Sequence, residues 1–181
     1  KDFVTLTTEK MIFGGIHDHL GGGFSRYSTD QKWLVPHFEK MLYDNALLVI
    51  LFSEMYQITG EKIFRDTVGK TLDYILRVLT NKEGIFFSAE DADSDGEEGK
   101  FYVWSKREVT SIIQSPLHQS IFCEYFDITE VGNFEGKNIL NIKTSVEHLA
   151  RKYGLDVNEV NNLIAVNSAR LFDIREKRIK P

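Results

Sequence analysis

The side chains best suited to chemistry in this sequence gather between residues 14 and 45, among five glycines. They include three histidines, His17, His19 and His37, and the carboxylate of Glu39. Histidine is the residue type that most readily gives or takes a proton near neutral pH. A carboxylate in partly apolar surroundings has a raised pKa and can share that task. We therefore predict that these four residues act as catalytic acids and bases.

A second group in the same stretch is suited to holding a ligand. Arg26 could clamp an anionic group, or it could simply pair with Asp18 or Asp30. Aromatic rings beside glycines either stack on a ligand or pack within the fold, and the sequence leaves both alternatives open. We predict that the substrate-binding residues of this stretch are Arg26, Tyr27, Trp33 and Asp44.

Structural explanations also stay open for the predicted catalytic residues. His17 and His19 could be loop residues that bond to the backbone. Glu39 falls in the first turn of a predicted helix, where the helix dipole alone would favour a carboxylate. On that helix, His37 shares a face with Met41, whereas Glu39 points the other way, so the two need not act as a pair.

An acidic turn follows later in the chain. Asp91, Asp93, Asp95 and Gly96 match the start of a calcium-binding loop, D-x-D-x-D-G, but Tyr102 stands where the bidentate glutamate should be. A solvated turn, or carboxylates lining the same cavity as the first loop, fits better than calcium. We predict no other metal and no cofactor, and we add Asp91, Asp93 and Trp104 to the substrate-binding residues.

Helices must position these loops. The segment 5–12 reads as the end of a helix that Gly14-Gly15 stops, and 24–27 has strand character. A helix over 37–58, with Pro36 in its first turn, is apolar on nearly every face and should be buried all round. The helix over 61–79 has a single apolar stripe, so the two should form an αα-hairpin with an inner and an outer member.

The rest of the chain is also mostly helical. Residues 81–104 carry alternating and aromatic residues on both sides of the acidic turn, which indicates a β-hairpin. The segment 133–142 reads as a loop with a small strand. Further helices are predicted over 105–113, 117–126, 144–153 and 156–178. A mostly α fold built of helical hairpins suits a layered array or toroid.

The composition limits the classes of protein to which this chain can belong. The 181 residues are 42% hydrophobic and 27% charged with a net charge of −5, which is typical of a soluble globular protein and argues against nucleic-acid binding. The sequence shows no signal peptide and no apolar run long enough for a bilayer, so we predict a cytoplasmic protein without membrane association. Cys123, the single cysteine, cannot form an internal disulfide and is predicted to be buried and inert.

Four strings of sequence resemble one known family. Residues 14–28, 33–46, 88–104 and 133–140 are similar to the widespread family of YyaL and the spermatogenesis-associated thioredoxin-domain proteins. The strings extend over most of residues 11–142, so chance similarity is a poor explanation.

This resemblance implies a fold and a place in a longer chain. Family members carry a thioredoxin-like domain followed by an (α/α)6 toroid similar to N-acylglucosamine 2-epimerases and six-hairpin glycosidases. Residues 1–181 would be the first half of that toroid, with the thioredoxin-like domain upstream and the remaining hairpins downstream. We expect a fragment without thiol–disulfide chemistry, inactive on its own, which associates through uncovered apolar surface.

The resemblance also suggests a carbohydrate-active domain with a small-molecule substrate, epimerase- or isomerase-like, in which histidines do acid/base chemistry. This step rests on analogy of fold. A non-catalytic module that binds a glycan or a partner is an alternative. So is a glycoside hydrolase, in which Asp91 and Asp93 with Glu39 would supply the two carboxylates. The sequence does not decide whether the domain is an enzyme.

Overall fold

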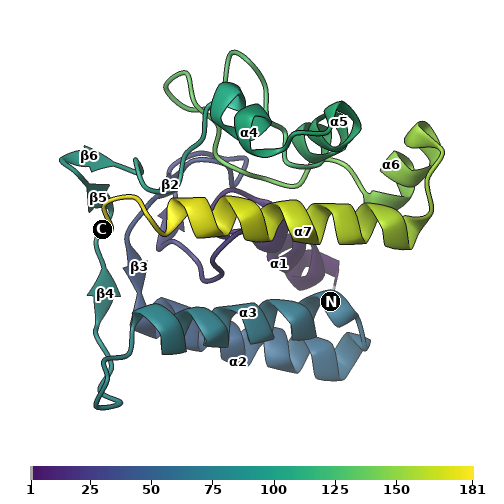
Figure 1. Ribbon diagram of the computed structural model, residues 1–181. Coiled ribbons are helices and arrows are strands. Elements are labelled where there is room, and N and C mark those ends of the chain that lie inside the picture. Colours follow the sequence, from purple (N-terminus) through teal and green to yellow (C-terminus); the bar gives the residue numbers. More distant parts are fainter. Residues whose placement is uncertain (1) are drawn as a thin grey trace. The chain divides into compact units, whose positions relative to one another are not determined.

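The computed structural model describes residues 2–181, which form mainly helices with three short two-stranded antiparallel sheets (Figure 1). The predicted mostly α fold is confirmed, whereas the toroid stays a prediction. The chain divides into two compact units, with unit 1 ending at Lys100 and unit 2 running from Phe101 to Lys180. Among the described helices, none is both long enough and apolar enough to cross a bilayer.

Unit 1 contains three helices. Its helices are α1 (Asp2–Phe13), α2 (Leu42–Thr59) and α3 (Lys62–Val78). Its short strands lie in the segment between α1 and α2 and in the segment that follows α3. The strands pair as β1 (Tyr27–Ser28) with β2 (Pro36–His37), β3 (Lys40–Met41) with β4 (Ala89–Glu90), and β5 (Asp93–Ser94) with β6 (Glu97–Glu98).

The predicted αα-hairpin is confirmed, because α2 and α3 pack along each other (Figure 1). Gly60 ends α2 in the left-handed conformation, with φ of 72°, which glycine adopts at little cost.

The glycine-rich loop after α1 is tied to α2 by packing and by hydrogen bonds. The buried ring of Phe24 lies 5.4 Å from the ring of Phe52, and Phe52 continues the aromatic core to Phe64. The amide of Phe24 donates to Oδ1 of Asn45 at 2.7 Å, and Nδ2 of Asn45 donates back to the Phe24 carbonyl at 3.0 Å. One fully buried side chain of α2 thereby fixes the loop backbone.

A buried ion pair holds the same loop from the other side. Nζ of Lys40 lies 3.0 Å from Oδ2 of Asp18, and their side chains are only 1% and 6% exposed. The ammonium also donates to the Gly22 carbonyl at 3.1 Å and lies 4.4 Å from the centre of the Tyr74 ring. Gly23 packs so closely on that ring, at φ of 77°, that a Cβ atom there would come within 2.4 Å of it.

His17 and His19 face the end of α1. Nδ1 of His17 lies 3.0 Å from the Ile12 carbonyl, and Nε2 of His19 lies 2.9 Å from the Gly14 carbonyl. Their rings touch edge to face at 4.8 Å. Burial lowers the pKa of both side chains, that of His19 to about 4, so both are neutral imidazoles that satisfy carbonyl groups left open where the helix ends.

The predicted start of the second helix is wrong. Residues 36–41 are extended, because His37 pairs with Tyr27 and Lys40 pairs with Glu90 across two sheets, and α2 begins only at Leu42. Pro36 stands in a short strand rather than in a helical turn. Glu39 therefore lies outside the helix, and the predicted helical spacing of His37 and Met41 does not exist.

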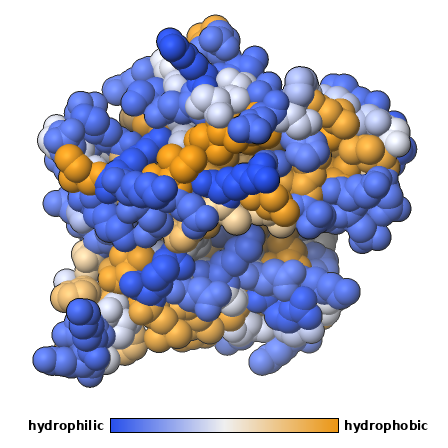
Figure 2. All heavy atoms as spheres, viewed as in Figure 1, coloured by the Kyte–Doolittle hydropathy of each residue, from blue (hydrophilic) through white to orange (hydrophobic). Residues whose placement is uncertain are grey.

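Two further expectations for unit 1 need correction. The segment 81–104 is not one hairpin, because β4 pairs with β3 and only β5 and β6 pair around the acidic turn. The helix α2 is not buried all round, because Leu47, Ile50 and Ile58 are 62%, 56% and 65% exposed. Hydrophobic surface is visible where α2 and α3 lie (Figure 2).

Unit 2 contains the four helices that the sequence predicted, namely α4 (Lys106–Ile112), α5 (Pro116–Tyr125), α6 (Val146–Tyr153) and α7 (Val157–Arg175). Side chains cap all four N-termini, with complete capping boxes at α4 and α7. Cys123 is buried, as predicted. Trp104 is fully buried with the Arg178 guanidinium 3.8 Å from its ring centre, and Arg178 donates to the carbonyls of Phe101 and Val103.

The buried ion pair supplies a stability prediction. Lys40→Met removes the ammonium from a buried ion pair with Asp18, which should lower the free energy of unfolding by about 3–5 kcal/mol. Lys100→Met is the matched control, because its partners Asp95 and Glu97 are exposed, and it should lower the free energy of unfolding far less. Urea unfolding measures both, and equal losses would contradict the central role of Lys40.

The neutral histidines should make stability depend on pH. Their folded-state pKa values lie below the unfolded value of 6.5, so below that pH the unfolded chain takes up protons that the folded chain excludes. The free energy of unfolding should therefore fall between about pH 6.5 and pH 4, by up to about 1.4 kcal/mol per pH unit for each histidine. Urea titrations across that range should show a shallower slope for His19→Gln than for His148→Gln, a control at an exposed position.

The uncovered side chains of α2 should drive association. We expect the chain to dimerise or to be poorly soluble at micromolar concentration, since large exposed apolar patches favour contact between copies. Light scattering after size exclusion would detect this, and Leu47→Glu with Ile50→Glu should shift the protein toward monomer. A monodisperse monomer of the unaltered chain would refute the expectation.

Candidate functional site

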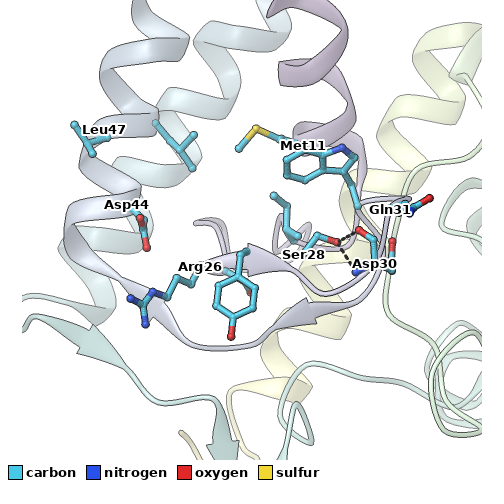
Figure 3. Close-up of a pocket in the computed structure, with 12 residues that line it drawn as sticks. Met11, Arg26, Ser28, Asp30, Gln31, Asp44 and Leu47 are labelled. Carbon is cyan, nitrogen blue, oxygen red and sulfur yellow. Dashed lines mark hydrogen bonds between the residues drawn. The ribbon is translucent and has the colours of Figure 1, made fainter.

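Unit 1 contains an open cavity of about 660 Å³ between α1, α2 and the loop that carries β1 (Figure 3). Four of the predicted substrate-binding residues line it: Arg26, Tyr27, Trp33 and Asp44. The remaining lining residues are a mixture of apolar and small polar side chains: Met11, Ile16, Ser25, Ser28, Asp30, Gln31, Leu47 and Leu48.

Asp30 shapes the loop that forms one wall of the cavity. Its carboxylate accepts hydrogen bonds from the amides of Lys32, Leu34 and Val35. Burial alone would raise the pKa of Asp30, but these amide bonds outweigh burial and lower it. The turn places Trp33 at φ of 61°, and its carbonyl accepts from the Gly15 amide at 2.7 Å. Trp33 is thereby held against the glycines that follow α1.

A chain of polar contacts runs beside the cavity. Nη1 of Arg26 lies 3.2 Å from Oε2 of Glu39, and the same oxygen lies 3.7 Å from Nε2 of His37. On the other side of the imidazole, Nδ1 of His37 lies 2.8 Å from Oε1 of Glu98. The Tyr27 ring, which lines the cavity, stacks on the His37 ring at 5.1 Å. This arrangement links a carboxylate-bound histidine to the cavity wall.

Strand pairing explains how residues far apart in sequence meet there. The register of β1 and β2 places Tyr27 opposite His37, and the Arg26 amide donates to the Glu39 carbonyl at 2.9 Å. Oε1 of Glu98 also accepts from the Phe38 amide at 3.2 Å, which fixes the carboxylate.

The end of β6 lies so close to the Phe38 ring that the residue after it, Gly99, must lack a side chain. A Cβ atom on Gly99, at φ of 74°, would come within 2.4 Å of the Phe38 ring.

The structure brings six predicted site residues to the cavity or its edge and leaves the other five elsewhere. At the cavity are Arg26, Tyr27, Trp33 and Asp44, and beside them lie His37 and Glu39. The contact between His37 and Glu39 departs from the sequence-based expectation, and it exists because both residues are in extended backbone rather than on a helix.

The remaining predicted residues do not line this cavity. His17 and His19 are buried against the end of α1. The Asp91 carboxylate is turned to the amides of Ala92 and Asp93, and Asp93 is exposed in β5. Trp104 belongs to unit 2, where it is fully buried.

Glu98 is a residue of the site that the sequence analysis did not include among its predicted site residues. It is one of two adjacent glutamates that form β6, and it lies 61 positions from His37. Nothing local separates it from its neighbour Glu97, which instead contacts Lys100. The hydrogen bond to the imidazole is the only signal that identifies it.

The charges around the cavity differ in how far they are compensated. The pKa of Arg26 is raised, first by Tyr43 and then by Glu39. Burial raises the pKa of Asp44, an effect that Arg26 partly opposes. Oδ2 of Asp44 is shielded from solvent and has no hydrogen-bond partner among the described residues.

The acidic turn is held by a lysine. Nζ of Lys100 lies 3.0 Å from Asp95 and 2.8 Å from Glu97, so an ammonium already occupies the place where carboxylates would gather around calcium. Within residues 2–181, no group of three or more histidine, cysteine, aspartate or glutamate side chains is arranged to hold a metal ion. The calcium alternative at Asp91, Asp93 and Asp95 therefore gains no support.

Comparison with known proteins gives close relatives of greater length. Spermatogenesis-associated protein 20 of Homo sapiens is 38% identical over 199 residues, which covers 97% of this chain and 25% of that protein. The protein of the same name from Mus musculus is 37% identical, with 96% of this chain and 25% of that protein covered. An uncharacterized protein of Caenorhabditis elegans is 33% identical, with 97% and 27% covered.

No protein-family model matches the sequence. The chain spans about a quarter of the length of the curated relatives that it matches. The similarity extends over both units, because 97% of the chain is aligned with the human protein. By this similarity, which agrees with the resemblance seen in the sequence strings, the chain belongs to the family of spermatogenesis-associated protein 20.

Proposed function

We propose that the cavity of unit 1 binds a small carbohydrate and that His37, held by Glu98, moves a proton onto and off that substrate. The observation that carries this proposal is the 2.8 Å contact between Nδ1 of His37 and Oε1 of Glu98 beside the cavity. A histidine oriented by a carboxylate is a recurrent arrangement for general acid/base catalysis.

The geometry suggests how each group would act. An ionised Glu98 can only accept a hydrogen bond, so Nδ1 of His37 carries the proton and Nε2 keeps a lone pair. When Nε2 takes a proton from the carbon beside a sugar carbonyl, Glu98 and Glu39 stabilise the imidazolium that results. Return of the proton from Nε2 to the neighbouring carbon, on the same face, gives an isomer. An epimer forms when a proton reaches the opposite face of the first carbon, either from water or from Nε2 after the enediolate has turned over in the cavity.

The cavity also suits the proposed ligand. Its volume of about 660 Å³ lies within the range of ordinary small-molecule sites. Tyr27 and Trp33 offer aromatic faces for the C–H side of a sugar ring, and Arg26 can stabilise negative charge on a carbonyl oxygen. The hydrolase alternative gains less support, because Asp91 and Asp93 do not line the cavity.

The test follows deuterium entry in heavy water. The protein is incubated with free and N-acylated hexoses, and NMR follows deuterium at the carbon beside the carbonyl. His37→Ala should lower the exchange rate by about 10²–10⁴-fold, the usual contribution of a general acid or base. Glu98→Gln, which keeps the size of the side chain but not its charge, should lower it by about tenfold or more. His148→Ala changes an exposed histidine of unit 2 and should leave the rate unchanged.

Two other outcomes would contradict the proposed catalytic role of His37. Exchange that persists in His37→Ala would remove this histidine from the chemistry. If no hexose exchanges but sugars still bind, and binding depends on Tyr27 and Trp33, the domain is a non-catalytic binding module.

A further inference from the structure

The Asp44 carboxylate on α2 is bonded differently from the carboxylates at the same position of two other helices. Asp44 is the third residue of its helix, the position at which Glu108 of α4 and Glu159 of α7 close capping boxes. Those two carboxylates accept from the amides of the N-cap residues, at 2.7 Å and 2.9 Å. At α2 the N-cap residue Met41 has no side-chain cap, and no such bond fixes Asp44.

Asp44 instead faces the cavity with an unused acceptor. Its carboxylate extends from α2 toward the segment that carries Arg26, just before β1 (Figure 3). Oδ2 is closed off from solvent and has no hydrogen-bond donor among the described residues, so neither water nor the protein compensates that side of the carboxylate. Burial raises the pKa of this carboxyl group, which agrees with an acceptor that the protein itself leaves uncompensated.

The other charges that line the cavity are already in use. Asp30 accepts three backbone amides through its two carboxylate oxygens. Nη1 of Arg26 lies 3.2 Å from Glu39, and Tyr43 raises the pKa of the Arg26 guanidinium. Of these three charged lining residues, Asp44 is therefore the one with an oxygen that has no hydrogen-bond donor among the described residues.

We infer that Asp44 determines specificity by accepting a hydrogen bond from a hydroxyl or ammonium group of the ligand, so that the site takes neutral and amino sugars and rejects sugars with a carboxylate or phosphate at that end. This inference rests on the proposed carbohydrate site and names its substrate class. An anionic group beside Asp44 would meet like charge in partly desolvated surroundings, whereas an ammonium or hydroxyl group would give the carboxylate a hydrogen-bond donor on the side that lines the cavity.

Three probes of similar size test the inference. Ligand-observed NMR titrations measure the affinity of the protein for glucosamine, glucose and glucuronate near neutral pH. Glucosamine should bind about tenfold or more tightly than glucuronate, because a charge-assisted hydrogen bond is gained in one case and a like-charge contact in the other. Asp44→Asn should weaken glucosamine binding by about tenfold and reduce the preference over glucuronate to about threefold or less.

Controls separate this inference from folding and from catalysis. Glu54→Gln removes the same charge from an exposed position of α2 and should leave the preference intact. Circular dichroism should show the same folded spectrum for both variants. Equal or tighter binding of glucuronate, an unchanged preference in Asp44→Asn, or no binding of any probe would overturn the inference. A preserved preference together with no deuterium exchange would instead count against His37 chemistry alone.

Discussion

The arrangement of unit 1 depends on the burial of one ammonium group. Lys40 is almost completely enclosed, and a charge in that position requires close partners because desolvation is costly. Asp18 and the Gly22 carbonyl supply those partners, and the Tyr74 ring of α3 lies against the ammonium. One side chain of β3 thus holds the glycine loop against the helical hairpin. The glycines are needed because backbone must come this close to an aromatic ring.

The cavity follows from that constraint. With the loop fixed at Phe24 by Asn45 and at Asp18 by Lys40, the chain after it can pair as β1 with β2, which places the Tyr27 ring over His37. The extended segment that carries Lys40 also carries His37 and Glu39, so the buried anchor and the half-buried polar residues are two faces of one short stretch.

Three histidines of this chain illustrate how the surroundings of a side chain give one residue type separate roles. His17 and His19 are buried, neutral and bonded to carbonyl groups, which makes them part of the framework. His37 is 29% exposed, bonded to a carboxylate and stacked on a residue of the cavity wall, the surroundings in which a proton can be exchanged with a ligand. Sequence spacing treats all three alike, because it contains no information about burial.

The sequence by itself determined the local features: the mostly α fold, the helical hairpin, the helices of unit 2, and the stretch in which the cavity residues gather. Periodicity and capping act within a few residues, so they can be recognised along the chain. Only the tertiary structure decided that α2 begins at Leu42 and that Glu98 meets His37. Those outcomes depend on strand pairing and on a hydrogen bond between residues 61 positions apart, whose free energy exists only once the chain has folded.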